Sequence, residues 1–236
     1  LQITTPGGGI RGSLITTLLL ILLTLIIALP LGVGGAIYLS EYAKKNKFTK
    51  VLRSLIEMTS GIPSIIFGLV GATIFIPFLN VTIQSDGPSI LAGAMTLAIM
   101  LLPIIIRTTE ESLKVIPQSF RHASLALGAS KTQTIFKVVL PNSISGILTA
   151  TLLSIGRIIG ESAALIYTIG TAIKDQVAVS QNSTSLAVHI WSIMAGENPN
   201  YDGACAIAII ILLVVLVLNL LVKLISKRTN RMEVKS

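Results

Sequence analysis

The sequence is poor in charged residues and in cysteine, and each shortage excludes a class of protein. Charged residues make up 12% of the 236 positions and hydrophobic residues 52%, with a mean hydropathy of +0.84. Ordinary soluble domains carry about 25% charged residues, so this composition indicates a protein that lies in membrane lipid. The single cysteine, Cys205, excludes a disulfide or a cysteine-rich metal site within one chain.

Signatures of nucleic-acid binding and of catalysis are also missing. The formal charge is +8, but the basic residues punctuate long apolar runs instead of gathering on one water-facing surface, which argues against a nucleic-acid partner. Residues 127–132 resemble a phosphate-binding loop, yet Leu125 and Ser130 stand where the Walker pattern needs glycine. The apolar segments contain no paired His and Glu metal motif and no nucleophile beside a base. We therefore expect no enzyme activity, ATP, metal or cofactor in this chain itself.

Five apolar stretches qualify as membrane-spanning helices, each of which takes about 20 residues. They are Ser13–Leu39, Ser64–Leu79, Ser89–Ile106, Ser143–Ile169 and Gly203–Ile225. The second is short and is compatible with continuation from a preceding helix. The expected fold class is therefore all-α, a polytopic membrane protein with a helical bundle. Because the sequence opens at Leu1 with a polar, glycine-rich stretch, we expect a sixth span upstream.

Lysine and arginine gather in three connections, and cytoplasmic loops hold the excess of these residues. The opposite side has only Arg11 and Lys174, so we expect a cytoplasmic C-terminus. We expect one transmembrane domain over 1–236, with a cytoplasmic loop at 107–141 and an external loop at 171–202 that contains a short helix. The clustered basic residues are Lys44, Lys45, Lys47, Lys50, Arg53, Arg107, Lys114, Arg121, Lys131, Lys137, Lys223, Lys227, Arg228, Arg231 and Lys235.

The 107–141 loop has the pattern of two short helices separated at Gly128. Ile116, Phe120, Ala123 and Leu127 fall on one face of the first helix. A glycine at the break permits a backbone conformation that other residues resist. This amphipathic pattern by itself is equally typical of a loop that lies on the membrane surface.

The spacing within this loop resembles the EAA signature of ABC-importer permeases: Glu-Ala-Ala, three residues, Gly, nine residues and Ile-x-Leu-Pro. His122 and Ser124 replace the Glu and the second Ala, and Val138 replaces the Ile. In that family the loop forms a coupling helix in a groove of the ATPase, so the resemblance implies a type I importer fold and an ATPase partner that binds ATP and Mg. The coupling residues that it implies are His122, Ala123, Ser124, Leu127, Gly128 and Ala129, with Leu140 and Pro141 at the end of the loop.

The fourth apolar stretch contains two charged residues, Arg157 and Glu161. Charged residues at the centre of a bilayer cost at least about 2.5 kcal/mol each and are usually functional. Four residues apart on a helix, the two share a face and can neutralise one another, so one interpretation is a structural pair that fixes packing. The other is oxyanion handling. In that case the guanidinium attracts the anion, and the carboxylate accepts a proton that phosphate carries at neutral pH and sulfate lacks.

Small and polar residues surround this pair. Ser154 and Thr168 extend the polar stripe at helical spacing, so we expect them to line a substrate pathway together with the charged residues. Gly156 and Gly160 lie on a neighbouring face, where their spacing lets another helix approach closely.

Three stretches resemble the phosphate-uptake permeases of the Pst system, in the pattern of the A-type subunit. They are Tyr38–Ala43, Ile62–Gly68 and Ile155–Leu165. The resemblance implies a bacterial inner-membrane protein that transports inorganic phosphate by alternating access. It also implies three partners: a related C-type permease, ATPase subunits and an external phosphate-binding protein.

Two alternatives stay open. An ABC permease for another oxyanion or solute keeps the coupling loop but gives Arg157 and Glu161 no phosphate role. An ion-driven secondary transporter or channel uses Glu161 to carry protons and leaves the loop without a partner.

Overall fold

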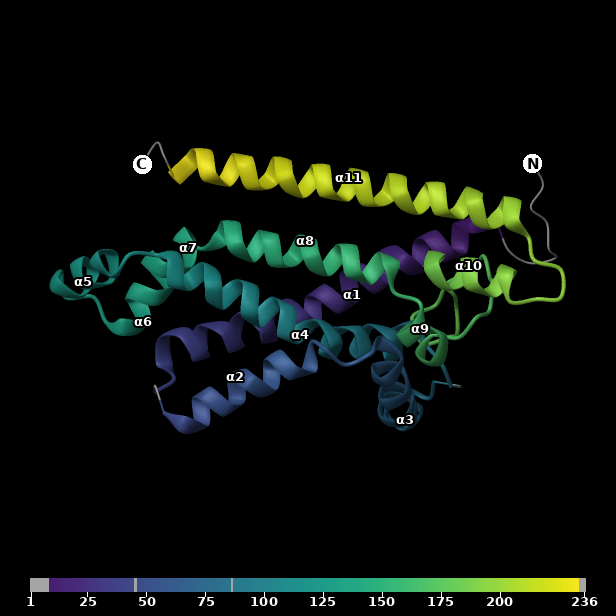
Figure 1. Cartoon of the computed structure of the whole chain (residues 1–236), viewed down its shortest axis with the longest axis horizontal. Helices are drawn as coiled ribbons and strands as arrows, with labels where there is room; N and C mark the ends of the chain where they lie inside the picture. Colours follow the sequence, from purple (N-terminus) through teal and green to yellow (C-terminus); the bar gives the residue numbers. More distant parts are fainter. Residues whose placement is uncertain (1–8, 45, 86, 234–236) are drawn as a thin grey trace. The chain divides into compact units, whose positions relative to one another are not determined.

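Helices form all the regular structure in the described part of the chain, as Figure 1 shows. The computed structural model describes residues 9–44, 46–85 and 87–233; Lys45, Asp86 and Lys235 are among the positions outside that part. The all-α prediction is confirmed. The elements are α1 (Ile10–Ile37), η1 (Tyr38–Tyr42), α2 (Lys47–Thr59), α3 (Ser64–Ile83), α4 (Ile90–Val115), α5 (Gln118–Ala126), α6 (Lys131–Thr134), η2 (Ile135–Val139), α7 (Leu140–Asn142), α8 (Ile144–Gly160), α9 (Ala163–Thr168), α10 (Leu186–Met194) and α11 (Tyr201–Glu233), where η marks a π-helical turn.

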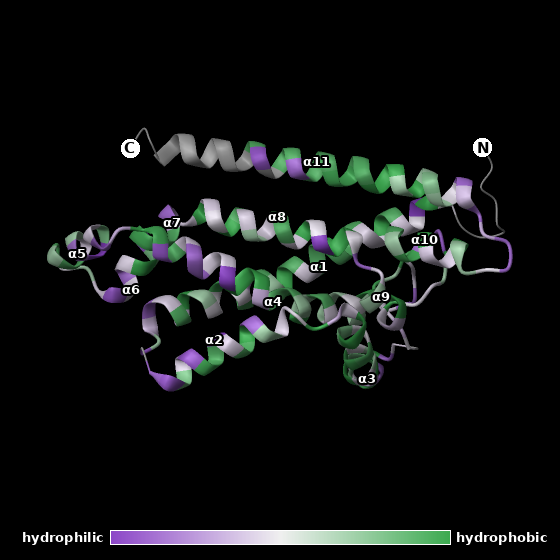
Figure 2. Cartoon of the chain, viewed as in Figure 1, coloured by the Kyte–Doolittle hydropathy of each residue, from purple (hydrophilic) through white to green (hydrophobic). Residues whose placement is uncertain are grey.

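Four helices are long and apolar enough to cross a membrane: Ile10–Tyr42, Ser64–Ile83, Ile90–Val115 and Tyr201–Leu221. A fifth candidate is the pair Lys131–Asn142 and Ile144–Gly160, which is bent by 62°. The first, second, third and fifth predicted spans overlap the four single helices, whereas the fourth overlaps the bent pair only over its second helix, Ile144–Gly160. Figure 2 shows α11 apolar along most of its length, and only 6% of its apolar window is buried, so its surface suits lipid.

The fourth predicted span is not one continuous helix. α8 ends at Gly160 and α9 begins at Ala163, so the predicted helix Ser143–Ile169 is wrong at residues 161–162. Glycine weakens a helix because it loses the most conformational freedom on folding, which favours a break at Gly160. The break leaves Glu161 between the two helices.

The predicted 107–141 loop is helical for most of its length. α4 continues past Arg107 to Val115 and carries the ion pair Arg107–Glu111 at 3.1 Å. The predicted break between α5 and α6 is confirmed at Gly128, whose φ of +84° favours glycine. η2 and α7 continue the helix that α6 begins.

Contacts divide the chain into two compact units. Unit 1 comprises Leu1–Ile27, Gly61–Met100 and Ile155–Val217. Unit 2 comprises Ala28–Ser60, Leu101–Ser154 and Leu218–Ser236. The single transmembrane domain expected over 1–236 stays a prediction.

Each unit has its own apolar core. In unit 1 the largest fully buried side chains come mainly from α1, α4, α8, α9 and α10, and include Leu20, Leu97, Ile158, Leu165 and Leu186. In unit 2 the buried cluster consists of Ala36, Ile37, Leu113, Ile135 and Val139. The candidate functional residues lie on or beside helices whose buried side chains pack in these two cores.

Candidate functional site

Two of the stretches that resemble phosphate-uptake permeases meet in unit 1. Helix α3 begins in Ile62–Gly68, α9 begins in Ile155–Leu165, and the two helices lie side by side (Figure 1). A Cβ atom at Gly68 would lie 2.7 Å from the Cα of Ala164 and 2.8 Å from its carbonyl oxygen. Only glycine permits so close an approach, which fixes the backbone that follows Glu161.

The carboxylate of Glu161 is held at the start of α9. Its Oε1 accepts a hydrogen bond from the backbone N–H of Ala164 at 3.1 Å, and its own N–H donates to the carbonyl of Ile158 at 3.3 Å. A carboxylate satisfies one of the unpaired N–H groups in the first turn of a helix, which explains why a new helix begins here. Glu161 is 8% exposed, so a buried carboxylate is fixed between α8 and α9.

Arg157 lies in the last turn of α8 and is half-buried. Within the described residues it forms no ion pair at 4.0 Å or less, with Glu161 or with any other carboxylate. The prediction that the two residues share one helical face is wrong, because α8 ends at Gly160 and Glu161 leaves the helical path. The two charges therefore do not neutralise one another by direct contact.

The other residues predicted around this pair fall into two groups. Ser154 and Thr168 are fully buried, and each hydroxyl donates to the carbonyl four residues earlier, at 2.8 and 3.0 Å. Gly156 and Gly160 are exposed, and no atom of the described chain lies within 4 Å of the position of a Cβ. Their roles in the substrate pathway and in helix packing stay predictions.

The second candidate region is the docking segment, residues 118–134, in unit 2. Its apolar side chains are exposed: 49% for Phe120, 46% for Leu125 and 89% for Leu127. His122 and Ala123 are exposed as well. An amphipathic helix ordinarily turns its apolar face to the core, and α5 does the reverse. Exposed apolar surface of this kind marks a site of contact with protein or membrane.

A fixed turn joins the two arms of the docking segment. The hydroxyls of Ser124 in α5 and Thr134 in α6 share a hydrogen bond of 2.9 Å. Ser130 Oγ accepts from the N–H of Gln133 at 3.2 Å, and Gln133 Oε1 accepts from the N–H of Ser130 at 2.8 Å. This reciprocal capping defines the start of α6, and Gly128 supplies the turn before it.

The remaining coupling residues lie at the edges of this element. Ala129 is half-buried and its N–H donates to the carbonyl of Ser124 at 3.2 Å. Leu140 packs against the buried cluster of unit 2, and Pro141 lies in the first turn of α7. The structure thus brings the predicted coupling residues together within one helix–turn–helix element and the helix that follows it.

Ion pairs in unit 2 are absent from the sequence-based predictions. Arg53 Nη2 lies 2.7 Å and Lys114 Nζ 2.9 Å from Glu110 Oε1, beside a cavity of about 110 Å³. Arg121 Nη2 lies 2.7 Å from Glu41 Oε1. In the sequence-based prediction, Arg53, Lys114 and Arg121 contribute only to the positive charge of the cytoplasmic loops. The missed signal is that two acidic residues, Glu41 and Glu110, lie in helical segments where most of the neighbouring charges are basic.

The 171–202 loop of unit 1 contains α10, which confirms the predicted short helix. His189 of α10 is 3% exposed, and its Nδ1 shares a hydrogen bond of 2.7 Å with Ser13 Oγ. Burial lowers the pKa of His189, which favours the neutral imidazole. No three His, Cys, Asp or Glu side chains of the described residues gather closely enough to hold a metal ion.

Two further uncharged contacts join the 171–202 loop to α1. The backbone N–H of Leu186 donates to Thr17 Oγ1 at 3.0 Å. The hydroxyls of Thr16 and Ser183 share a hydrogen bond of 2.7 Å. The hydroxyl-bearing residues are buried, so the loop is tied to α1 by neutral groups.

Known proteins resemble the chain in sequence and in fold. A family model described as binding-protein-dependent transport system inner membrane component matches residues 28–231. The probable ABC transporter permease protein YqgI of Bacillus subtilis is 34% identical over 226 residues, which cover 88% of this chain and 75% of that protein. The phosphate transport system permease protein PstA of Yersinia pestis is 36% identical over 222 residues, which cover 94% and 73%. An inward-facing structure of the MetNI methionine ABC transporter matches with a TM-score of 0.69 at 21% identity, over 94% of both chains.

Proposed function

The chain belongs to the family of binding-protein-dependent transport system inner membrane components, as a permease component of an ABC importer, and we propose that its cargo is inorganic phosphate. The relative named as a phosphate permease supports this cargo, since its similarity extends over 94% of the chain. The fold does not distinguish cargoes, because the methionine transporter has the same one.

The observation that carries the proposal is the buried carboxylate of Glu161, held without an ion pair where α3 and α9 meet. Arg157 lies one helical turn earlier in the chain and is half-buried. Its guanidinium presents a planar fork that suits the oxygens of phosphate. The carboxylate accepts the proton that phosphate retains at neutral pH and sulfate lacks. The absence of a direct pair among the described residues disfavours the interpretation in which the two charges only fix packing.

The docking segment is the element through which an ATPase drives transport by alternating access. Its exposed apolar side chains, Phe120, Leu125 and Leu127, need a covering surface, and a groove of an ATPase provides one. ATP and Mg are bound by that partner. The excess of Lys and Arg in the connections supports a cytoplasmic position for this segment and for the C-terminus in a bacterial cell.

Two further partners complete the importer. A related C-type permease pairs with this chain, and the open face at Gly156 and Gly160 suits close contact with one of its helices. An external phosphate-binding protein delivers the anion to the side that carries the 171–202 loop, where α10 presents an exposed Trp191.

Uptake of radiolabelled phosphate tests the cargo and the role of the charged pair. We expect Glu161→Gln and Arg157→Gln each to lower uptake about tenfold, which corresponds to the loss of one hydrogen bond to a charged group. Glu161→Gln should also let sulfate compete. Glu197→Gln is the matched control, because Glu197 is exposed in the 171–202 loop. Unchanged uptake together with unchanged exclusion of sulfate would refute the assignment.

Co-purification separates an ABC permease from an ion-driven transporter or channel. We expect the wild-type chain to bring down an ATPase and Gly128→Val to weaken that association, because a β-branched residue resists a φ of +84°. Gly34→Val is the control, since no atom lies within 4 Å of its Cβ position and its φ is not positive. A chain that transports phosphate alone in vesicles would exclude the ATPase.

A further inference from the structure

The buried face of α5 carries a charge where an apolar side chain is usual. Arg121 is 9% exposed, although Phe120 beside it is 49% exposed. Its Nη1 donates to the carbonyl of Ile116 at 2.7 Å, and its Nη2 donates to the carbonyl of Leu113 at 2.9 Å and to Glu41 Oε1 at 2.7 Å. One guanidinium thus joins α5 to the end of α4 and to η1.

Stability alone is a poor reason for this arrangement. Desolvation of two charges offsets most of their attraction, and well-packed apolar residues in place of a buried pair often give equal or greater stability. A buried pair instead fixes one arrangement of its elements, because each charge is costly to leave alone. The Arg121–Glu41 pair therefore specifies where α5 lies on η1.

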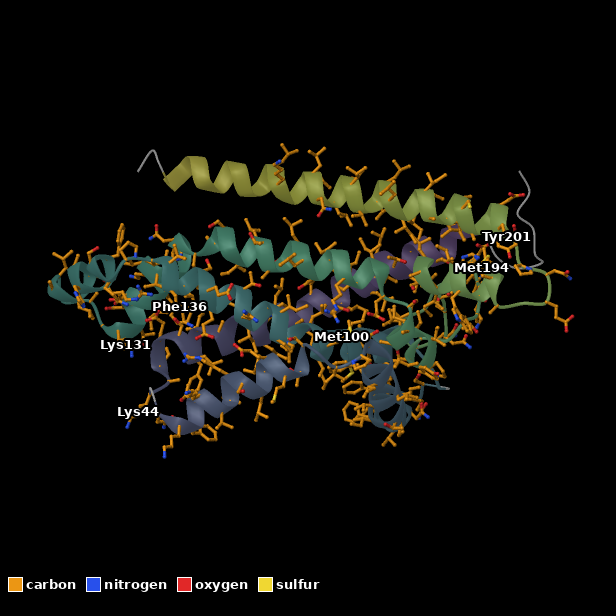
Figure 3. All side chains as sticks on the ribbon, in the orientation of Figure 1. Lys44, Met100, Lys131, Phe136, Met194 and Tyr201 are labelled. Carbon is orange, nitrogen blue, oxygen red and sulfur yellow. The ribbon has the colours of Figure 1, made fainter. Side chains whose placement is uncertain are left out.

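The neighbouring residue of η1 holds the other arm of the docking segment. The hydroxyls of Tyr42 and Thr132 share a hydrogen bond of 3.1 Å. The ammonium group of Lys131, labelled in Figure 3, lies 5.0 Å from the centre of the Tyr42 ring, in the range of a cation–π contact. Thr132 and Lys131 belong to α6, so consecutive residues of η1 contact both sides of the Gly128 turn.

A backbone hydrogen bond within η1 and buried residues directly before it fix the position of η1. Its π-helical hydrogen bond runs from the N–H of Ala43 to the carbonyl of Tyr38 at 2.8 Å. The residues just before it, Ala36 and Ile37, belong to the buried cluster of unit 2. π-helical turns are rare and occur often at functional sites.

We propose that η1 is a two-point clamp that makes the docking segment and the adjoining part of α1 move together, with Glu41 holding α5 and Tyr42 holding α6. This inference rests on the proposed docking of an ATPase to residues 118–134. Displacement of the exposed face of α5 by the ATPase then moves α1 through both contacts. Without the clamp, the two arms shift against η1 and the displacement is lost. Glu41, Tyr42 and Arg121 are positioning residues for transport.

The test measures phosphate uptake and ATP hydrolysis on the same reconstituted full-chain importer. Glu41→Gln removes the charge in a nearly isosteric side chain, and we expect about a tenfold fall in phosphate carried per ATP hydrolysed, a typical size for coupling between sites. Tyr42→Phe keeps the ring and removes only the hydroxyl, so a smaller fall in the same ratio is expected.

Matched controls are available beside both residues. Glu111→Gln alters an exposed glutamate of α4, and Tyr38→Phe alters an exposed tyrosine of η1 whose hydroxyl has no hydrogen bond within the described residues. Both controls should keep the wild-type ratio. An unchanged ratio in Glu41→Gln and Tyr42→Phe overturns the clamp. So does an equal fall of uptake and hydrolysis, because that result indicates lost assembly.

Amide hydrogen exchange of the chain without partners gives a readout that needs no ATPase. Glu41→Gln should raise exchange in α5 and Tyr42→Phe in α6, with α10 unchanged as the internal reference. If the wild-type chain brings down no ATPase, the proposed function is wrong and the exchange measurement alone decides whether the clamp exists. Unaltered exchange in both α5 and α6 overturns the clamp. If the Glu41→Gln chain is not recovered in membranes, exchange in the Tyr42→Phe chain decides whether the clamp exists.

Discussion

The two units of the chain both bury hydroxyl groups but differ in their charged contacts. In unit 1, α1 is tied to the 171–202 loop by hydroxyls, a backbone amide and a histidine whose pKa burial lowers. In unit 2, ion pairs join α2 to α4 and η1 to α5. A neutral hydrogen bond needs no counter-charge. A buried charge is costly without its partner, so an ion pair ties an element to one specific neighbour. Unit 2, which contains the docking segment, is thus the unit that holds the ion pairs found among the described residues.

One residue breaks this division. The described chain buries three charged side chains, Glu110, Arg121 and Glu161. The two in unit 2 have counter-charges within 2.7 Å, and Glu161 in unit 1 has only a backbone N–H. A buried carboxylate without a counter-charge among the described residues is the feature on which the proposed phosphate site rests.

The largest loss of stability is expected from Glu110→Ala in unit 2. This change removes the acceptor shared by Arg53 and Lys114, and we expect a loss of about 2–3 kcal/mol, at the low end for a broken buried pair because both bases are partly exposed. Amide hydrogen exchange in α2 and α4 measures it. Glu111→Ala, at an exposed pair, should change stability by less than about 1 kcal/mol. Equal effects of the two changes would show that the buried pair contributes no more to unit 2 than an exposed pair does.

A smaller effect is expected from Thr17→Val in unit 1. The backbone N–H of Leu186 loses its acceptor while it stays buried, which costs about 1–2 kcal/mol. Faster exchange of the α10 amides, with α5 unchanged, is the measurement. The paired change Thr16→Val with Ser183→Ala replaces both partners of a hydroxyl contact and should be nearly neutral. If the paired change costs as much as Thr17→Val, loss of a hydroxyl contact is costly even when no buried group is left without a partner.

The smallest effect is a pH dependence that belongs to unit 1. Because burial lowers the pKa of His189, the unfolded chain binds a proton more readily, and stability is complete above the ordinary histidine pKa of about 6.5 and falls as pH drops below it. The slope cannot exceed about 1.4 kcal/mol per pH unit for one proton. Thermal unfolding at pH 7.5 and at a pH about one unit below 6.5 should show this loss in the wild type. The loss should shrink in His189→Asn, and an identical loss in that variant would assign it to other groups.

Hydropathy and glycine placement predict most of the fold. The apolar runs locate the spans, and Gly128 locates the turn of the docking segment, because only glycine adopts its backbone conformation without strain. The break after Gly160 escapes the same reasoning. Apart from Glu161 and Ser162, the residues around the break are apolar, and Gly160 is equally interpretable as a packing glycine, so the stretch Ser143–Ile169 looks continuous in the sequence.

The candidate sites are predictable as segments but not as contacts. Motif spacing identifies Arg157, Glu161 and the docking residues. It cannot tell that Glu161 bonds to Ala164 and not to Arg157, because that depends on where the helix ends. Nor can it tell that Arg121 faces inward, since its partner Glu41 lies 80 residues away in the sequence. Long-range pairing of this kind is set by the packing of whole helices.

The outward apolar face of α5 affects the life of the protein before assembly. A newly made copy presents Leu127, directly after α5, at 89% exposure, with Phe120 and Leu125 exposed in α5 itself. Chaperones and membrane proteases select such surfaces on orphan subunits, and surface apolar patches also promote aggregation. If a partner covers this surface in the assembled transporter, we expect a copy made without that partner to be cleared faster than an assembled one.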